Sequence, residues 1–488
     1  MKILSKKKIK IGLEVHIQIT KLKTKLFCGC SSNYRNESAN TFVCPTCLGI
    51  PGALPVLNKA AIEFALKVAL ALNCRISKSM LFFRKNYFYP DMTKNFQITQ
   101  YDRAGGVPLA LDGYLYIRVK GLRKKIQVSR VHLEEDPGKL IHQGPIDKSS
   151  YTLVDYNRAG ITLLEIVTEP DLSSPREARV FLQTLRIILD SLDVMNSELE
   201  GSIRCDANIS IEDGTRVEVK NISSFKEVDR ALSFEIIRQR DMLEKRLSVK
   251  RDTRHWDETR RRTISLRTKE EEHDYRYFPE PDLVPIRITD NFISKLKSSI
   301  PELPEARMKR FIKEYGIPRY DAEVLVSNKS LSDFYEEAVN LYHKPKEISN
   351  WIMSDLLGSL NENDLDLVDS KISSQHFVDM IKLIDLGVIS GKIAKMILLE
   401  MVLTGKPPKQ IVDDKSLRVI DTHKILDKIL KQVFSKNKTA VKDALTDPKA
   451  VNFLIGQVME KTKGKADPEL SNLLINKKLN EMRINESD

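Results

Sequence analysis

The sequence has no continuous apolar segment of the roughly 20 residues that a membrane-spanning helix needs. It also lacks the glycine-rich phosphate-binding patterns G-x-x-x-x-G-K-[ST] and G-x-G-x-x-G, so nucleotide phosphates would have to be bound in another way. Serine pairs occur, but we identify none in a glycine-rich setting typical of a nucleophile. These absences argue against a membrane protein, a P-loop or dinucleotide-binding enzyme, and a serine hydrolase.

Length and charge set broad limits on the fold and on binding partners. At 488 residues the chain is too long for a single core, and length alone predicts about three domains. The net charge of +12 fits either a lysine-rich proteome or a polyanionic partner such as nucleic acid, and charge does not decide between them. The basic N-terminus leads into an alternating segment, not an apolar one, so we expect a cytoplasmic chain without a secretion signal. An organellar location stays open, although we see no transit peptide.

Four of the six cysteines form two close pairs, Cys28-Gly-Cys30 and Cys44-Pro-Thr-Cys47, separated by thirteen residues. In a reducing compartment this spacing is typical of tetrahedral Zn²⁺ and not of disulfides. Four thiolates leave no position for water, so such a zinc ion would be structural. The alternative is four unrelated thiols. The other two cysteines, Cys74 and Cys205, are expected in the core.

The pattern of the chain changes near residue 296. Before it, alternating segments are mixed with separated helical ones, which favours an α+β fold over a parallel sheet. After it, helical periodicity takes over, and the two prolines of TGKPPKQ (404–410) predict a linker. We therefore expect a mixed domain over residues 1–295, a helical domain over 296–408 and a second, lysine-rich helical domain over 409–488.

Several predicted strands carry charged residues on one face. KIGLEVHIQI (10–19) has aliphatic residues at its odd positions and Glu14 and His16 on the opposite face. A single polar face of this kind is more often merely solvated. Together, however, these faces suit Mg²⁺ held by carboxylates and by substrate phosphates, which predicts magnesium-assisted phosphoryl transfer. On the other strands, the charged residues on such faces are Arg204, Asp206, Arg216, Glu218 and Lys220. Phosphate charge could be neutralised by Arg84, Lys85 and Lys220.

Glu165 lies among aliphatic residues in ITLLEIV (161–167), where an unpaired buried carboxylate would be costly. We expect a basic side chain, another cation or a metal beside it. The segment VHLEED adds His132, Glu134, Glu135 and Asp136, but its alternation breaks, so the sequence does not assign their faces.

Several long blocks go beyond such patterns. They include FRKNYFYPDMTKNFQITQYD (83–102), VDYNRAGITLLEIVTEPD (154–171) and DYRYFPEPDLVP (274–285), together with IGLEVHIQI, HLEEDPGK, GSIRCDANIS and VEVKNISSF. They closely resemble the GatB family, the B subunits of the glutamine-dependent aspartyl/glutamyl-tRNA amidotransferase, and the resemblance covers essentially the whole chain. A related archaeal family shares the catalytic motifs but carries an inserted domain for which this chain has no room, which favours the GatB family.

The resemblance implies an ATP- and Mg²⁺-dependent ligase. In this family, the protein binds Glu-tRNA(Gln) or Asp-tRNA(Asn) and phosphorylates the side-chain carboxylate of the attached amino acid. Ammonia released from glutamine by a partner glutaminase subunit then forms the amide, and a small bridging subunit completes the heterotrimer. The resemblance further implies a catalytic sheet similar to that of glutamine synthetase, followed by an all-α cradle and an all-α tRNA-binding tail.

The resemblance also implies site residues. It places the metal and nucleotide site on Glu14, His16, Glu135 and Glu165, with Mg²⁺ on the last three, whereas roles for Asp206, Glu218 and Lys220 are our inference from their matching motifs. In the tail, three lysines just before the helix cap Asp467-Pro468 would contact a tRNA phosphate, unless they are simply solvated: Lys461, Lys463 and Lys465.

Two other functions are weighed against this one. A non-catalytic, zinc-containing tRNA-binding scaffold would tolerate glutamine at Glu14, Glu135 and Glu165. A free-standing ligase that amidates a small acid with free ammonia would stay active without residues 411–488.

Overall fold

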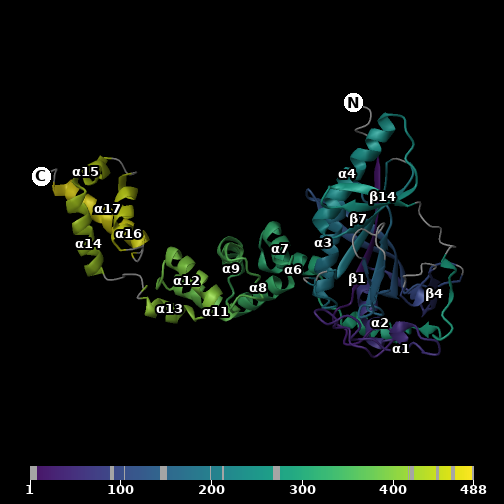
Figure 1. Cartoon of the computed structure of the whole chain (residues 1–488). Helices are drawn as coiled ribbons and strands as arrows, with labels where there is room; N and C mark the ends of the chain where they lie inside the picture. Colours follow the sequence, from purple (N-terminus) through teal and green to yellow (C-terminus); the bar gives the residue numbers. More distant parts are fainter. Residues whose placement is uncertain are drawn as a thin grey trace. The chain divides into compact units, whose positions relative to one another are not determined.

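The computed structural model describes residues 8–87, 93–103, 105–142, 151–197, 199, 201–211, 214–267, 275–415, 417, 423–446, 450–462, 466 and 468–485. The chain divides into two compact units, Met1–Pro304 and Glu305–Asp488 (Figure 1). Among the described residues, no helix is both long and apolar enough to cross a membrane.

The first unit is built around a nine-stranded sheet with the strand order β14-β13-β12-β11-β1-β10-β7-β6-β2. Neighbouring strands are antiparallel except for the parallel pair β12 and β13. The predicted mixed fold with a mostly antiparallel sheet is thus confirmed. The strands are β1 (Ile9–Gln18), β2 (Arg75–Ile76), β6 (Ala110–Val119), β7 (Leu122–Glu135), β10 (Thr162–Thr168), β11 (Ile203–Ile211), β12 (Val217–Ile222), β13 (Asp252–Asp257) and β14 (Arg262–Arg267).

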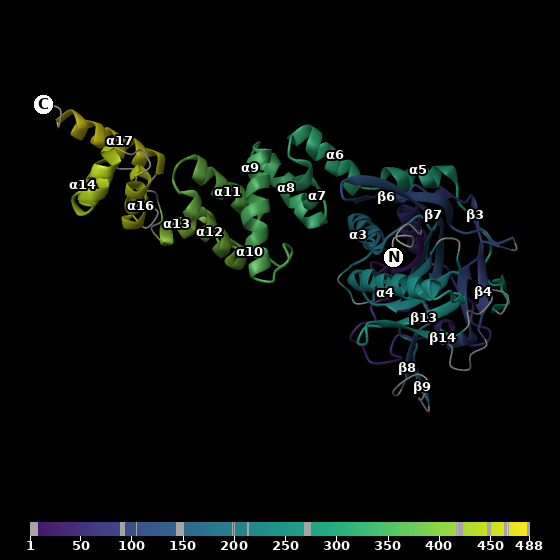
Figure 2. The same cartoon turned by 90° about the horizontal axis from the view of Figure 1, so that it is seen from above.

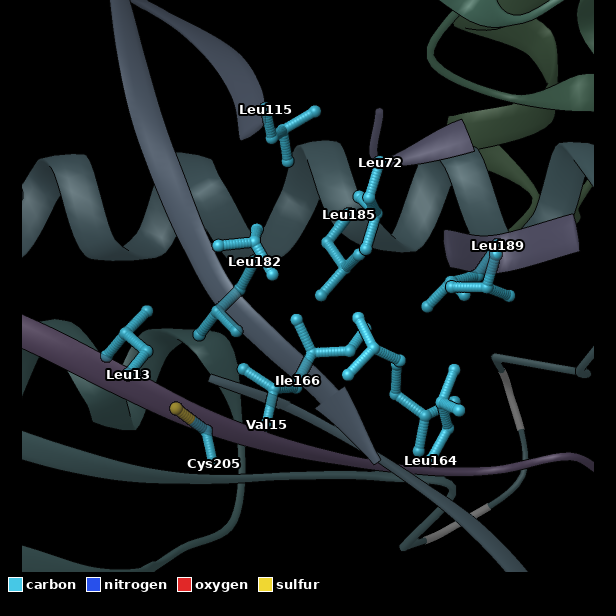
Figure 3. Close-up of a cluster of buried hydrophobic side chains, with 14 of the residues drawn as sticks. Leu13, Val15, Leu72, Leu115, Leu164, Ile166, Leu182, Leu185, Leu189 and Cys205 are labelled. Carbon is cyan, nitrogen blue, oxygen red and sulfur yellow. The ribbon is translucent and has the colours of Figure 1, made fainter. Parts of the chain in front are cut away.

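Helices cover the apolar face of this sheet. The odd-numbered residues of β1 from Ile11 to Ile17 are buried in one core with α2 (Lys59–Ala71), α3 (Pro175–Ser191) and α4 (Phe225–Glu244). Helices α3 and α4 lie side by side (Figure 2). Figure 3 shows the core residues that β1, β10 and α3 contribute: Leu13, Val15, Leu164, Ile166, Leu182, Leu185 and Leu189. The alternation read from the sequence therefore places the even-numbered residues of β1 on the opposite face.

Smaller elements complete the first unit. Three of the small strands form a separate sheet in the order β15-β4-β5, and the others form the two-stranded pairs β16-β3 and β8-β9. Their bounds, with those of the remaining helices, are α1 (Pro45–Leu48), β3 (Ser79–Met80), β4 (Phe82–Asn86), the 3₁₀ turn η2 (Thr93–Asn95), β5 (Phe96–Gln100), β8 (Lys139–His142), β9 (Thr152–Asp155), β15 (Phe278–Pro279), β16 (Ile286–Arg287) and α5 (Asp290–Ser298).

The second unit is helical and contains two separate hydrophobic clusters, one within residues 308–412 and one within 426–479. Its helices are α6 (Pro304–Tyr315), α7 (Arg319–Leu325), α8 (Lys329–Leu341), α9 (Pro345–Trp351), the π turn η5 (Ile352–Leu356), α10 (Leu357–Glu362), α11 (Ser374–Asp385), α12 (Gly391–Thr404), α13 (Pro408–Asp414), α14 (His423–Lys436), α15 (Lys438–Thr446), α16 (Val451–Lys461) and α17 (Pro468–Asn485).

The prolines near residue 407 do not make the linker that we expected over 404–410. Pro408 is the first residue of α13, and Ile411 and Val412 of this helix belong to the first cluster of the second unit. Proline is favoured at the first position of a helix, where its missing N–H costs no hydrogen bond. The division into domains at residues 295 and 408 stays a prediction.

Candidate active site

The central strands bring charged residues together on the face of the sheet away from the helices. Glu14 of β1 is the direct partner of Asp206 on β11, and Lys220 of β12 donates a hydrogen bond of 2.9 Å to Asp206. A neighbouring row of direct partners crosses four strands: His132, Glu165, His16 and Arg204. Strand pairing thus joins residues that are far apart in the sequence.

All of these side chains except that of His132 line a cavity of about 320 Å³. Its size is at the lower end of the range for ligand pockets. The lining is unusually rich in charge of both signs, unlike a merely solvated strand face. The acidic and basic residues are Glu14, Glu134, Asp136, Glu165, Asp206, His16, Lys85, Arg158, Arg204 and Lys220.

His16 lies at the centre of the acidic group. Its Nε2 atom is 3.9 Å from a carboxylate oxygen of Glu14, 3.5 Å from Glu134 and 3.7 Å from Glu165. Burial by itself lowers the pKa of His16, but the contact with Glu165 and the other two carboxylates outweigh it and raise the pKa to about 9. The cluster therefore attracts positive charge.

Glu165 has the compensating basic groups that its apolar sequence context led us to expect. Its Oε1 atom is 3.5 Å from Arg130 Nε and 3.6 Å from His132 Nδ1, yet it accepts no hydrogen bond from the described residues. Burial raises the pKa of Glu165, but His16, His132 and Arg130 more than reverse this and hold the pKa well below its usual value. Glu165 is thus a buried, ionised carboxylate that is compensated by basic groups and has one oxygen without a hydrogen bond from the described residues.

Glu134, and not its neighbour Glu135, turns toward the cavity. The Oγ1 hydroxyl of Thr99 donates a hydrogen bond of 2.7 Å to Glu134, and burial raises the pKa of Glu134 to about 7. Glu135 forms an ion pair with Lys94 in which both side chains are 2% exposed. It also accepts a 2.8 Å hydrogen bond from the amide of Ile98.

The structure therefore separates Glu135 from the predicted magnesium ligands. Strand alternation continues through the end of β7, so Glu134 shares a face with His132, and Glu135 lies on the other one. The predicted partners Glu14, His16 and Glu165 do come together, since their ligand atoms lie within 4.8 Å of one another. The alternation of VHLEED, counted from His132, was the sequence signal for this difference.

We expect Glu135→Gln to act on stability. Removing one partner of a buried ion pair leaves the other charge uncompensated, which costs about 3–5 kcal/mol in the free energy of unfolding. Urea denaturation would measure this, and the double variant Lys94→Met/Glu135→Leu should recover much of the loss because neither charge is then buried. Equal stability of Glu135→Gln and the unmodified protein would contradict the structural role.

The three predicted phosphate-binding residues separate in the same way. Lys85 and Lys220 line the cavity. Arg84 is instead held by Glu280, through hydrogen bonds of 2.7 and 2.9 Å, and by Asp282 at 3.3 Å. Because Arg84 and Lys85 are adjacent on β4, they point to opposite sides of the strand.

The sequence analysis placed Arg204 on a polar strand face without giving it a role, missed Arg158, and grouped Glu218 with residues that line the cavity. Arg204 and Arg158 both line the cavity, but only Arg204 had a sequence signal, since it alternates with Asp206 on β11. Arg158 lies in the loop between β9 and β10, where no periodicity assigns a side chain to a face. Glu218 is not among the cavity-lining residues; it is 3.7 Å from Lys220 and accepts a hydrogen bond from Thr253.

The four paired cysteines also come together. The Sγ atom of Cys47 lies 3.3 Å from that of Cys28, 3.6 Å from Cys44 and 3.7 Å from Cys30. Zinc–sulfur bonds of about 2.3 Å in a tetrahedron put the sulfurs roughly 3.8 Å apart, so this spacing fits a tetrahedral Zn²⁺. The hydrogen bond from Cys28 and the nearby Lys25 lower the pKa of Cys47 to about 4. The same hydrogen bond raises the pKa of Cys28, and burial raises that of Cys30, so the spacing of the sulfurs and not their pKa values supports the metal site.

Of the three tail lysines, the structure describes one. Lys461, the last residue of α16, donates a hydrogen bond of 2.9 Å to Gln432. Lys463, Lys465 and the cap residue Asp467 lie outside the described residues. The predicted tRNA contact of these lysines stays a prediction.

Comparison with known proteins relates this arrangement to one family. Residues 9–294 match the family model described as the GatB/GatE catalytic domain, and residues 333–479 match the GatB domain. The chain belongs to the GatB family. It is 50% identical to the B subunit of the aspartyl/glutamyl-tRNA(Asn/Gln) amidotransferase of Sulfurisphaera tokodaii, over 96% of this chain and 99% of the relative.

Two further members of the GatB family are matched over nearly their whole length. The proteins of the same name from Saccharolobus solfataricus and Thermotoga maritima are 48% and 49% identical, over 96% of this chain and 99% and 98% of their own lengths. The segment that matches the catalytic domain contains all the cavity residues and the four clustered cysteines. The site built from strand pairing therefore lies within the catalytic domain of the GatB family.

Proposed function

We propose that this chain is the ATP-dependent amidating component of a tRNA amidotransferase. Its substrates would be Glu-tRNA(Gln) and Asp-tRNA(Asn), and its products Gln-tRNA(Gln) and Asn-tRNA(Asn). The observation that carries the proposal is the charged cavity on the nine-stranded sheet, which lies within the segment that matches the GatB/GatE catalytic domain.

The chemistry explains why such a cavity would be needed. A carboxylate is a poor acyl donor because oxide is a poor leaving group. Transfer of the γ-phosphoryl group of ATP to the carboxylate gives an acyl phosphate and ADP, and ammonia then displaces phosphate to form the amide. We propose that a partner glutaminase subunit releases this ammonia from glutamine and that a small bridging subunit completes a heterotrimer.

The cavity residues fit the binding of Mg²⁺ and phosphate. Glu14, His16 and Glu165 would hold the metal, since their ligand atoms lie within 4.8 Å of one another and Glu165 has an oxygen without a hydrogen bond from the described residues. Bound magnesium would offset the negative charge that gathers on the phosphates. Lys85 and Lys220 would neutralise further phosphate charge.

Two structural proposals accompany this function. The four cysteines would hold a structural Zn²⁺, since their sulfur spacing matches a tetrahedral site. The mostly antiparallel sheet with carboxylates on one face would correspond to a fold similar to that of glutamine synthetase.

The test uses this chain assembled with the glutaminase and bridging subunits, supplied with ATP, Mg²⁺ and ammonium in place of glutamine. We expect conversion of Glu-tRNA(Gln) or Asp-tRNA(Asn) to the amidated form, with one ADP released for each amide. The same assay without ATP is the control. Active glutaminase without amidation would favour the tRNA-binding scaffold, whereas amidation of free glutamate by this chain alone would favour the free-standing ligase.

A further inference from the structure

The segment between the two cysteine pairs contacts a loop that reaches the cavity. We call residues 28–47 the cysteine knuckle and residues 154–158 the arginine loop. Asn157, which is 1% exposed, accepts a hydrogen bond of 2.8 Å from the amide of Phe42 and donates one of 2.7 Å to the carbonyl of Ser38. Asn40 adds contacts of 2.8–3.1 Å with Val154, Asp155 and Tyr156.

A buried lysine connects the same elements. The side chain of Lys25 is fully buried, and its ammonium group donates to the Phe42 carbonyl at 2.8 Å, the Tyr156 carbonyl at 3.2 Å and the Cys47 sulfur at 3.4 Å. A lysine ammonium has three N–H donors, so these three acceptors satisfy it. One cation therefore links the cysteine cluster, the knuckle segment and the arginine loop.

The arginine loop ends at the wall of the cavity. Arg158 donates a hydrogen bond of 3.0 Å to the carboxylate of Asp136 and one of 3.1 Å to the carbonyl of Gly138. Arg158 and Asp136 both line the cavity, and Asp136 is fully buried. The position of Arg158 is thus set on one side by Asp136 and on the other by the loop that the knuckle holds.

A second contact, between Gly49 and Lys94, links the end of the knuckle to β7, the strand that carries Glu134 and Glu135. Gly49, directly after α1, has a φ of +66°, and a Cβ atom there would lie 2.8 Å from Cβ of Lys94. Lys94 is the buried partner of Glu135, which lies between the cavity residues Glu134 and Asp136 on the chain. A side chain at residue 49 would therefore disturb the Lys94 position.

We infer that the cysteine knuckle positions Arg158 in the cavity, through Lys25 and through the hydrogen bonds of Asn157. This inference rests on the proposed function, which makes the cavity the amidation site. Lys25 and Asn157 are positioning residues, since neither lines the cavity. Arg158 itself meets an anionic group of a substrate, either a phosphate of the nucleotide or the carboxylate of the aminoacyl group.

The decisive variant is Asn157→Ala, made in the complete heterotrimeric complex. It removes both hydrogen bonds to the knuckle but no cysteine, so zinc content should stay equal to that of the unmodified protein. We expect the dissociation constant of a non-hydrolysable ATP analogue, or the KM for Glu-tRNA(Gln), to rise about tenfold, which corresponds to the loss of one well-placed charged hydrogen bond. A higher dissociation constant for the ATP analogue would assign Arg158 to a phosphate of the nucleotide. A higher KM for Glu-tRNA(Gln) would assign it to the carboxylate of the aminoacyl group.

A double-mutant cycle tests whether Asn157 acts through Arg158. In an Arg158→Met background, Asn157→Ala should change neither constant further, because the group that it positions is already absent. Asn33→Ala is the matched control, since it alters an exposed asparagine of the same knuckle. The inference would be overturned if the effects of Asn157→Ala and Arg158→Met were fully additive. It would also be overturned if Asn157→Ala left both constants unchanged. Inactive unmodified protein would instead overturn the proposed function.

Discussion

Glu165→Gln is expected to reduce ammonium-dependent amidation by at least roughly two orders of magnitude, because metal stabilisation of transition-state charge is worth several kcal/mol. The substitution keeps the shape of the side chain but removes the charge that faces His16, His132 and Arg130. Glutamine is also a much weaker ligand for Mg²⁺ than a carboxylate. The rate should be measured at saturating Mg²⁺, ATP and tRNA, with circular dichroism to verify that the variant is folded.

Glu258→Gln is the matched control for this experiment. Glu258 is exposed in the turn between β13 and β14, so the same chemical change is made away from the cavity. It should leave the amidation rate unchanged. If Glu165→Gln retained the full rate while folded, the carboxylate cluster would not be the site of phosphoryl transfer, and the residue assignments proposed here would fail.

Loss of the Zn²⁺ that we propose for the cysteine knuckle should produce the second large effect. Cys47 is 2% exposed and its sulfur is within 3.7 Å of the other three, so Cys47→Ala removes the most buried ligand of the four. Structural zinc contributes about 10–16 kcal/mol to the folding of small zinc-binding peptides, and even a fraction of this would lower Tm substantially. We expect zinc content, measured by atomic absorption, to fall from one ion per chain to nearly none.

The control for this prediction is Cys74→Ala. Cys74 is buried but lies outside the cluster, so its replacement should retain one zinc per chain. Chelator treatment of the unmodified protein should reproduce the loss of Tm seen with Cys47→Ala. A protein purified with all four cysteines but without stoichiometric zinc, and insensitive to the chelator, would show that the cluster has no structural metal.

The polar face of the sheet was largely predictable because strand alternation is a local property. The odd and even positions of KIGLEVHIQI separate buried aliphatic residues from Glu14 and His16, and the structure retains this separation. The same rule, carried through the end of β7, would have selected Glu134 over Glu135. The family motif contains both glutamates side by side, and only their positions in the alternation of β7 distinguish the one that faces the cavity from the one that does not.

The residues that sequence reasoning missed belong to parts of the chain without periodicity. Arg158 reaches the cavity from a loop, and its position depends on Asp136 and on a segment more than one hundred residues earlier. Arg84 was expected to neutralise phosphate charge together with its neighbour Lys85. Its charge is instead neutralised by Glu280, almost two hundred residues later in the chain. Contacts of this range leave no local pattern.

The sequence by itself determined the mixed class of the fold, the mostly helical second half, the grouping of four cysteines and the family. Alternation, ligand spacing and long motifs are local properties of the chain, so they can be recognised without the structure. Only the tertiary structure decided which charges meet. Antiparallel pairing of β7, β10, β1 and β11 sets four distant residues in one row, and a one-residue difference in register reverses the face of every side chain. The same long-range packing links the cysteine knuckle to Arg158, since a buried lysine can lie there only where three acceptors from separate segments converge.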